Sequence, residues 1–421
     1  MGRILHIGLG NFHRAHQAWY TAQAGGWKIT AVSLRSRALR DAMAGQGNGY
    51  TLVTRGAEGA RYDWIEAIDR VLVAPDAPEA VLAALADPAV SVVTVTVTEK
   101  GYHLDAGGAL DLTDPLVLAD LASEAPQTLV GFLARGLARR SDPVTVMSCD
   151  NLPGNGRKLG AAVRRFAQGA GLTLCGASFP DSMVDRITPA TTEALKADVL
   201  AATGRADAAP VATETFTDWV IEDRFAGARP AWETAGARIV DEVAPYEMRK
   251  LRMLNGPHSL IAYLGQLRGH AHVHAAIADP VVAAAARGLM REAAETLPDG
   301  VRADAGDYAE ALMARFANPA LAHALAQIAM DGSIKLGVRI LPVIADRAVR
   351  GQASPFAAFG VAAWVAFVLR ETAAGRALND PQAAALAQDA GASDPVAALL
   401  ARIGYAGDPG PVRSRLAELR A

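Results

Sequence analysis

Four polar side chains that could together transfer a proton lie in the segment 246–258, namely Glu247, Lys250, Asn255 and His258. At about 100° per residue of an α-helix, all four fall within an arc of roughly 140° and face one way. Oxidation of a secondary alcohol needs a base for the hydroxyl proton while hydride leaves carbon. A lysine in a dry pocket can be that base near neutral pH, because desolvation disfavours its charged form. An asparagine could donate to the developing alkoxide, a histidine could hold a neighbouring oxygen, and a glutamate could pass the proton to water.

The same segment has a second interpretation, a charged surface helix that ends in a polar cap at Asn255-Gly256. Pro257 lacks the N–H that would bond to the Met253 carbonyl, so a kink is expected there. A kink beside a glycine could open space for a ligand. The residues alone leave both interpretations open.

A glycine-rich turn follows the first predicted strand, Ile4–Ile7. Two glycines spaced Gly-x-Gly allow a tight turn that brings backbone N–H groups against a pyrophosphate at a helix N-terminus. The third glycine of the usual dinucleotide fingerprint is absent, and His13 stands in its place. Such a turn can also be a plain connection between a strand and a helix, without a ligand. Its place at the start of the half of the chain in which strands and helices alternate favours a dinucleotide. The candidate cofactor-binding residues are Gly8, Gly10, Asn11, Phe12 and His13.

The second predicted strand ends in Ser33-Leu34-Arg35-Ser36-Arg37. Proteins dedicated to NAD often place a carboxylate near this point, where it holds the ribose 2′-hydroxyl. Here basic and hydroxyl groups stand instead, which suit the 2′-phosphate of NADP. The alternative is that Arg35 and Arg37 belong only to the solvated start of a helix.

Three further polar clusters are candidates for a ligand site. Ser148–Asn151 follows the strand Val144–Met147, at the carboxyl end where ligands bind to such sheets. Asp185-Arg186 lies between apolar residues and could equally be an internal ion pair. Asp331–Lys335 forms a polar break after an apolar segment.

The overall composition excludes several classes of function. The chain has 421 residues and a net charge of only -3, so it offers no basic excess for nucleic acid. We find no stretch of about 18 apolar residues and no room for a signal peptide, which predicts a cytoplasmic protein without a membrane span. Cys149 and Cys175 are far apart and are expected to be buried, reduced thiols. No cluster has metal-ligand spacing, so no metal is expected.

The pattern of predicted elements changes along the chain. Short β-branched strands alternate with helical segments in the first half, and strand signals nearly vanish after residue 246. This predicts an α/β Rossmann-type domain with a parallel sheet over 1–243, followed by a mostly α-helical domain over 244–421 with a ligand cleft between them. The expected strands are Ile4–Ile7, Ile29–Leu34, Val92–Thr98 and Val144–Met147. The expected helices include Ala80–Leu85, Leu116–Leu121, Ala283–Ala294, Tyr308–Phe316, Leu321–Met330 and Ala358–Leu369.

Taken together, these residues resemble the mannitol dehydrogenase family of long-chain polyol and uronate oxidoreductases. Lys250, Asn255 and His258 match the family's Lys-x4-Asn-x2-His signature, and the resemblance covers essentially the whole chain. It favours the catalytic interpretation of the polar helix. The matching segments are Gly8–His16, Thr96–Tyr102, Val146–Asn151, Phe179–Pro189, Trp219–Asp223, Tyr246–His258 and Asp331–Lys335.

The resemblance implies a role for each matching residue. Lys250 is the expected general acid/base, Asn151 and Asn255 the pair that polarises the reacting oxygen, and His258 a substrate-orienting group. Glu247 resembles the family's proton-relay carboxylate. The remaining matches are Asp185 and Lys335 on the substrate side and Thr98 on the cofactor side.

Within the family, the chain looks closest to the fructuronate reductase (mannonate oxidoreductase) branch. Mannitol-type members have glycine where this chain has Lys100, and arginine where it has Gln327. An added cation such as Lys100 suits a substrate carboxylate. The expected ligands are NAD or NADP and a sugar acid, with no metal, nucleic acid or membrane, and the chain is expected to be a monomer or small homo-oligomer. The alternatives are a polyol 2-dehydrogenase for mannitol, sorbitol or arabinitol, and a catalytically silent nucleotide-binding regulator.

Overall fold

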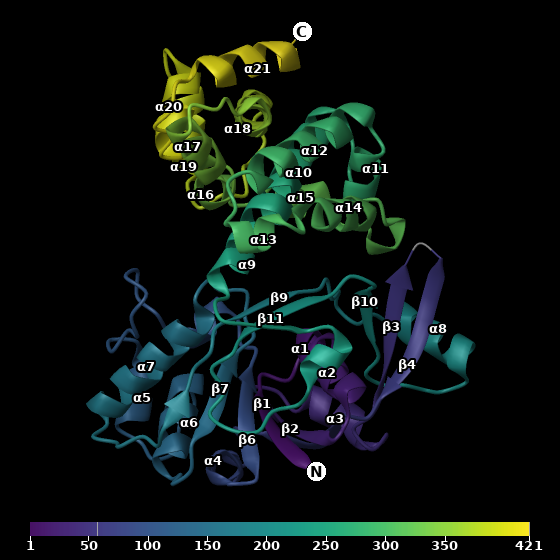
Figure 1. Cartoon of the computed structure of the whole chain (residues 1–421), viewed down its shortest axis with the longest axis vertical. Coiled ribbons are helices and arrows are strands. Elements are labelled where there is room, and N and C mark those ends of the chain that lie inside the picture. The colour runs from purple at the N-terminus through teal and green to yellow at the C-terminus, as the bar shows by residue number, and fades with distance from the viewer. Residues whose placement is uncertain (57, 421) are drawn as a thin grey trace. The chain divides into compact units, whose positions relative to one another are not determined.

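The computed structural model describes residues 1–56 and 58–420, apart from the side chains of Leu321 and Arg420. The chain forms two compact units, Met1–Ala244 and Pro245–Ala421 (Figure 1). The first unit is an α/β structure and the second is helical, so the predicted fold class is confirmed.

The main sheet of the first unit has six strands, and all of its neighbouring strands are parallel. The order β5-β2-β1-β6-β7-β8 reads 3-2-1-4-5-6 when only these strands are counted, which is the Rossmann order. The chain therefore reverses direction across the sheet between β1 and β6, the point where such folds bind ligands. The strands are β1 (Gly2–Ile7), β2 (Trp27–Ser33), β5 (Ile68–Val73), β6 (Val90–Val95), β7 (Val144–Ser148) and β8 (Ala177–Ser178).

Both faces of this sheet are buried, because successive residues of a strand point to opposite sides. Leu5 and Ile7 of β1 belong to a core shared with one set of helices, whereas Ile4 belongs to a second core on the other face. In Figure 1 the first set lies beside β6 and β7, and a second set, nearer the N-terminus, lies together beyond β1. The first set is α4 (Pro78–Ala86), α5 (Pro115–Leu121), α6 (Leu129–Ala138) and α7 (Asn155–Gly169). The second is α1 (Asn11–Ala15), α2 (Gln17–Ala24) and α3 (Ala38–Ala44).

Two smaller sheets complete the first unit, and the sequence did not predict them. Their strands are short and carry mixed polar and apolar residues, which hides the two-residue period of a strand. One sheet has the order β10-β3-β4 and the other β12-β11-β9. The strands are β3 (Tyr50–Gly56), β4 (Gly59–Ile65), β9 (Ser182–Asp185), β10 (Val211–Glu214), β11 (Asp218–Glu222) and β12 (Arg238–Val240), and helix α8 (Glu193–Thr203) lies between β9 and β10 in the chain.

The second unit is built from helices around α10 (Gly256–Leu267) and α18 (Pro355–Ala373), which pack on each other. The other helices are α9 (Ala244–Arg249), a π-helix (Lys250–Asn255), α11 (Val273–Ile277), α12 (Pro280–Ala294), α13 (Asp299–Arg302), α14 (Ala305–Phe316), α15 (Leu325–Ile328), α16 (Gly332–Arg339), α17 (Leu341–Val349), α19 (Ala383–Ala390), α20 (Pro395–Arg402) and α21 (Gly410–Arg420).

Two predicted elements differ from the structure. The strand expected over Val92–Thr98 ends at Val95, because the chain leaves the sheet into a 3₁₀ turn at Glu99–Tyr102. The helix expected over Leu321–Met330 is reduced to Leu325–Ile328, and its first part contains Ala322 with a left-handed backbone that no continuous helix allows.

Helix α18 also differs from expectation, since no segment was expected to be long and apolar enough to cross a membrane. Its 19 residues pass that test, with a mean hydropathy of 1.4 over 18 residues. Half of that window is buried inside the fold, and α18 packs against α10, α12 and α21. A core helix passes the same test, so this is weak evidence for a membrane span.

Candidate active site

The turn after β1 is built around a glycine that no other residue can replace. Gly8 has a φ of 107°, and a Cβ added there would lie 1.9 Å from the carbonyl oxygen of Thr96. Gly10 is different, because its added Cβ would meet only the Gly8 carbonyl oxygen at 3.7 Å. The backbone of the turn therefore packs tightly against the end of β6 and keeps open space at Gly10.

His13, which replaces the third glycine of the fingerprint, lies in the core rather than at the surface of the turn. Its ring stacks on His6 of β1, and His6 is held by the hydroxyls of Thr94 (2.9 Å) and Thr96 (3.0 Å). A glycine there normally lets helix and strand approach closely. Here a flat ring stacked on a flat ring gives that close approach instead. His13 is thus a packing residue, and the structure does not support its expected contact with a cofactor.

The side chains of Asn11 and Phe12 stabilise the turn through contacts within the protein. The Asn11 amide donates to the carbonyl of Pro189 (3.1 Å) and contacts the hydroxyl of Thr191 (3.2 Å). Phe12 is half-buried and stacks on His16, with ring centroids 5.1 Å apart. Any contact that these residues make with phosphate would therefore come from the backbone.

Asp150 ties the ends of β6 and β7 together. Its carboxylate accepts hydrogen bonds from the backbone N–H groups of Val97 and Thr98 (both 3.0 Å) and from the Tyr102 hydroxyl (2.7 Å). Burial raises the pKa of this carboxyl, while the Tyr102 hydroxyl and the two backbone donors lower it. Thr98 has a φ of 71°, a costly conformation for a β-branched residue, and Asp150 holds it there. Asn151 follows directly and is exposed.

The other expected substrate residues of the first unit have contrasting environments. Lys100 is exposed in the 3₁₀ turn after β6. Asp185 is buried at the end of β9. The internal ion pair between Asp185 and Arg186 does not form: Arg186 lies over the Trp19 ring (4.8 Å) and bonds to backbone carbonyls.

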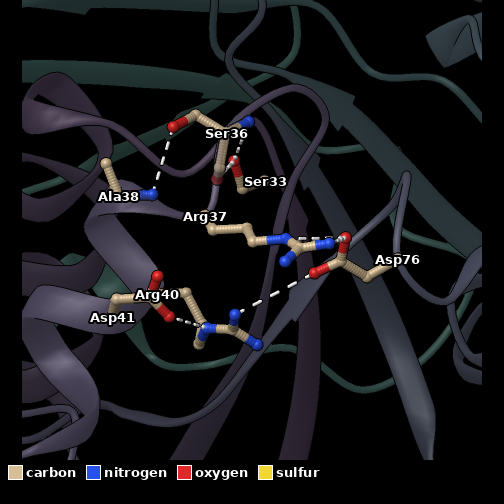
Figure 2. Close-up of polar contacts among 7 residues, drawn as sticks. All are labelled: Ser33, Ser36, Arg37, Ala38, Arg40, Asp41 and Asp76. Carbon is tan, nitrogen blue, oxygen red and sulfur yellow. Dashed lines mark hydrogen bonds and ion pairs between the residues drawn. The ribbon is translucent and has the colours of Figure 1, made fainter.

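At the carboxyl end of β2, one of the two expected arginines, Arg37, meets a carboxylate that follows a neighbouring strand (Figure 2). Arg37 donates through Nε (2.9 Å) and Nη2 (2.6 Å) to Asp76, which follows β5. Arg40 also approaches Asp76, at 3.9 Å. Arg35 is exposed. Sequence reasoning missed Asp76, because it depends on the unpredicted strand β5 beside β2.

The expected catalytic helix is not one continuous α-helix. Helix α9 gives way to a π-helix over Lys250–Asn255, and α10 begins at Gly256. Hydrogen bonds of a π-helix run from residue i to i+5, so the step of 100° per residue is wrong there, and so is the predicted arc. Pro257 stands in the first turn of α10, a position where a helix tolerates a residue without an N–H. Such π segments are frequent at functional sites.

The π-helix is anchored by the charged side chains next to its catalytic candidates. Arg249 pairs with Asp304 at 2.7 Å and lies over the Tyr308 ring at 4.3 Å. Arg252 pairs with Asp346 at 2.6 Å. These contacts and two buried apolar residues, Met253 and Leu254, place Lys250 in a buried position. The segment is therefore a buried element and not a charged surface helix. Glu247 and Asn255 are half-buried.

His258 sits in an aromatic pocket with cations around it. Its ring stacks on Phe316 (5.1 Å) and meets the edge of His323 (5.1 Å), and its Nε2 has no hydrogen-bond partner among the described residues. Burial holds the pKa of His258 well below its usual value, and the charges of His323, Arg315, Arg339 and Lys335 add to this.

Lys335 lies on the same side of α16 as Arg339, one helical turn away. Lys335 pairs with Asp331 at 3.6 Å. Burial lowers the pKa of Lys335, and the positive charge of Arg339 lowers it further. The start of α16 is fixed by close packing, because a Cβ at Gly332 would lie 2.5 Å from the Tyr263 hydroxyl. Arg339 donates to the Ser259 hydroxyl (3.1 Å), next to His258, and forms no ion pair in the described part of the chain.

The structure thus places the expected residues in two groups. Lys250, Asn255, His258 and Lys335 belong to the helical unit, where His258 and Lys335 interact electrostatically. Glu247 also belongs to the helical unit, in α9, and the others lie along the carboxyl edge of the main sheet and in β9. Sequence reasoning named Asp150 only as a member of the cluster after β7 and missed Asp76, Phe316 and Arg339. These three become relevant only through tertiary packing.

The thiols and metal-ligating groups add no further site. Cys149 is buried and Cys175 is only half-buried, and both are free. Over 1–56 and 58–420, no three His, Cys, Asp or Glu side chains are arranged to hold a metal ion.

Comparison with known proteins gives the same architecture over nearly the full length. The mannitol dehydrogenase Rossmann domain matches residues 2–234, and the mannitol dehydrogenase C-terminal domain matches residues 242–409. The D-mannonate oxidoreductase of Escherichia coli (strain K12) is 39% identical over 407 residues, which cover 91% of this chain and 83% of that protein.

Two solved structures are also similar. Substrate-free D-sorbitol dehydrogenase has a TM-score of 0.89 at 31% identity and covers 99% of this chain and 92% of its own. Mannitol 2-dehydrogenase of Pseudomonas fluorescens, in a ternary complex with NAD and D-mannitol, has a TM-score of 0.78 at 35% identity, covering 100% and 92%. The chain therefore belongs to the mannitol dehydrogenase family of oxidoreductases.

Proposed function

We propose that the protein is a metal-independent, NAD(P)-dependent oxidoreductase that interconverts a keto-uronate of the fructuronate type and an aldonate of the mannonate type. The observation that carries the choice of an acidic substrate is the set of cations around His258. Lys335 and Arg339 share one side of α16, and the charge of Arg315 also acts on the His258 ring. A neutral polyol has no need of such a charge.

The environment of Arg339 gives the strongest support for an acidic substrate. The half-buried guanidinium of Arg339 forms no ion pair among the described residues, although the charge of Asp331 acts on it from further away. The one neutral hydroxyl that it contacts does not replace the hydration that it loses. A substrate carboxylate would restore that loss through charge-assisted hydrogen bonds. Lys100 in the first unit is exposed and is a further cation that we assign to an acidic substrate.

Dinucleotide binding is supported by the turn after β1. Gly8 allows the close packing of the turn on Thr96, and the space at Gly10 leaves room for a pyrophosphate beside the backbone N–H groups. Thr98, held by Asp150, would lie at the same edge of the sheet. The bound cofactor supplies or accepts the hydride. The relative that was solved with NAD supports NAD. The sequence of Arg35 and Arg37 also suits NADP, but Arg37 is paired with Asp76.

The residues of the helical unit then do the proton chemistry. In the reducing direction, Lys250 gives a proton to the carbonyl oxygen as hydride reaches the carbon, and it takes that proton back in oxidation. The amides of Asn151 and Asn255 polarise the same oxygen. His258 stays neutral and orients the substrate, Glu247 relays the proton to water, and Lys335, together with Asp185, binds the sugar.

A polyol 2-dehydrogenase is the second candidate, supported by the relatives solved as sorbitol and mannitol dehydrogenases. The test measures loss of reduced-nicotinamide absorbance with fructuronate, tagaturonate and fructose, each with NADH and NADPH. Turnover of a keto-uronate supports the proposal, and turnover confined to fructose overturns it in favour of the polyol branch. Binding of NADH without any turnover would indicate a silent regulator. A cytoplasmic monomer or small homo-oligomer remains our expectation.

A further inference from the structure

The loops that follow β2 and β5 meet at one edge of the main sheet. The two strands are parallel neighbours, paired from Ile29–Ile68 to Ser33–Val73, so both chains leave the sheet at the same end. Asp76 sits in the tight turn after β5, with its backbone N–H bonded to the Val73 carbonyl (3.1 Å). Its carboxylate thereby reaches the arginines that follow β2 (Figure 2).

The loop that carries Arg37 is itself well defined. The Ser33 hydroxyl donates to the Ser36 carbonyl (2.7 Å), and the Ser36 hydroxyl accepts from the Ala38 N–H (3.1 Å). Arg37 leaves this loop with 65% of its side chain exposed and lies on Asp76, whose side chain is 25% exposed. The pair is therefore open to a ligand that approaches from solvent.

The chemistry of this pair bears on a dinucleotide, provided that the cofactor binds as proposed above. Folds of this type hold the ribose 2′-hydroxyl with a carboxylate near the end of the second strand, or a 2′-phosphate with an arginine there. This chain has both groups in one place, bonded to each other. A 2′-phosphate that approached Arg37 would meet a guanidinium whose Nε and Nη2 already donate to Asp76, and the carboxylate would repel it from a few ångströms away.

We propose that Asp76 is the residue that sets the cofactor preference of this protein, in favour of an adenosine ribose with a free 2′-hydroxyl. Asp76 neutralises Arg37 and lies near Arg40, and its second oxygen remains able to accept a hydrogen bond from the 2′-hydroxyl. The carboxylate that the sequence lacks after β2 is thus supplied by the adjacent strand. Removing its charge frees Arg37 for a 2′-phosphate.

The test uses two nucleotides that contain no nicotinamide and need no sugar substrate. Binding of AMP and of adenosine 2′,5′-bisphosphate is measured by isothermal titration calorimetry on the full chain. We expect Asp76→Asn to raise the affinity for the bisphosphate about tenfold relative to AMP, the effect of one partly screened charge a few ångströms away. Arg37→Gln should lower the affinity for the bisphosphate, and in the Arg37→Gln, Asp76→Asn double variant the gain should disappear.

Asp69→Asn is the matched control. Asp69 pairs with Arg3 at 3.1 Å with 31% of its side chain exposed, and it lies at the other end of β5. This variant makes the same change in net charge and should leave both affinities unchanged. An unchanged ratio in Asp76→Asn, or an equal rise in Asp69→Asn, overturns the proposal. Failure of AMP to bind the wild type overturns it together with the proposed cofactor position, whereas failure to reduce a keto-uronate affects only the substrate assignment.

Discussion

The imidazole ring of His13 lies on that of His6 with ring centroids 3.3 Å apart and an angle of 13° between the planes. Both rings are buried, and neither nitrogen of His13 has a hydrogen-bond partner among the described residues. Helix α1 and strand β1 thus approach closely without the third glycine. Burial lowers the pKa of His6 to about 3 and holds the pKa of His13 well below its usual value, with the charges of His6 and Arg14 adding to the latter.

This pair predicts acid instability of the first unit. A histidine with a lowered pKa in the folded state takes up protons in the unfolded state first, so stability is full above about pH 6.5 and falls as the pH decreases toward the folded pKa. His13→Phe keeps a flat ring but cannot be protonated. Its melting temperature, followed by circular dichroism between pH 7 and 4, should fall less steeply than that of the wild type, and parallel curves would contradict the assignment.

The two glycines of the turn should respond differently to alanine. Gly8→Ala forces a Cβ into the Thr96 carbonyl at a positive φ, and we expect a loss of about 3 kcal/mol or failure to fold. Gly10→Ala meets no close neighbour, so its melting temperature should change little while nucleotide affinity falls at least tenfold, because the methyl group occupies the phosphate space. Normal NADH affinity in Gly10→Ala would show that no phosphate lies there.

Asp150→Asn tests the contact between the ends of β6 and β7. An amide oxygen in place of Oδ1 can still accept from the Val97 and Thr98 N–H groups, but the NH₂ group then faces the Tyr102 hydroxyl that donates to Oδ2, so a loss of about 1–3 kcal/mol is expected. The KM for the nicotinamide cofactor should rise because a neutral amide holds the strained backbone of Thr98 less strongly than a carboxylate does. Asp105→Asn, in an exposed turn nearby, serves as the control. A rise in KM of equal size in the control would contradict a specific role for Asp150.

His258 should not be the group that titrates in the activity profile. Its pKa is held well below 6.5, so the ring is neutral throughout the range of pH 6–9. His258→Asn should lower kcat/KM by about ten- to a hundredfold without moving the acid limb of the pH–rate profile. A shift of that limb in the variant would mean that His258 carries the titrating proton.

Much of the fold follows from local patterns, and the site follows from them less completely. The buried strands β1, β2, β6 and β7 are apolar runs bounded by turn residues, which is why they could be predicted. The π-helix could not, since it leaves no periodic signal over six residues, and Pro257 predicted only a kink. Asp76 contacts Arg37, which is 39 positions away in the sequence, and Arg339 contacts Ser259, which is 80 positions away. The spacing of residues within a short segment cannot predict such contacts.

Lys250 is the residue on which the chemistry depends. Lys250→Ala should lower kcat at least a thousandfold while NADH still binds, because the general acid/base is lost and the turn after β1 is untouched. Tryptophan-to-nicotinamide energy transfer measures the binding. Retention of more than a tenth of kcat would exclude Lys250 as the general acid/base.

The most direct test of the central claim is the ratio of kcat/KM for fructuronate to that for fructose, measured in the wild type and in Arg339→Gln. We predict a ratio above about 100 in the wild type, equivalent to a few kcal/mol of charge-assisted binding. In Arg339→Gln the ratio should fall about tenfold, through a higher KM for fructuronate alone. A wild-type ratio below one, or a ratio that Arg339→Gln leaves unchanged, would contradict the assignment of the cations around His258 to an acidic substrate.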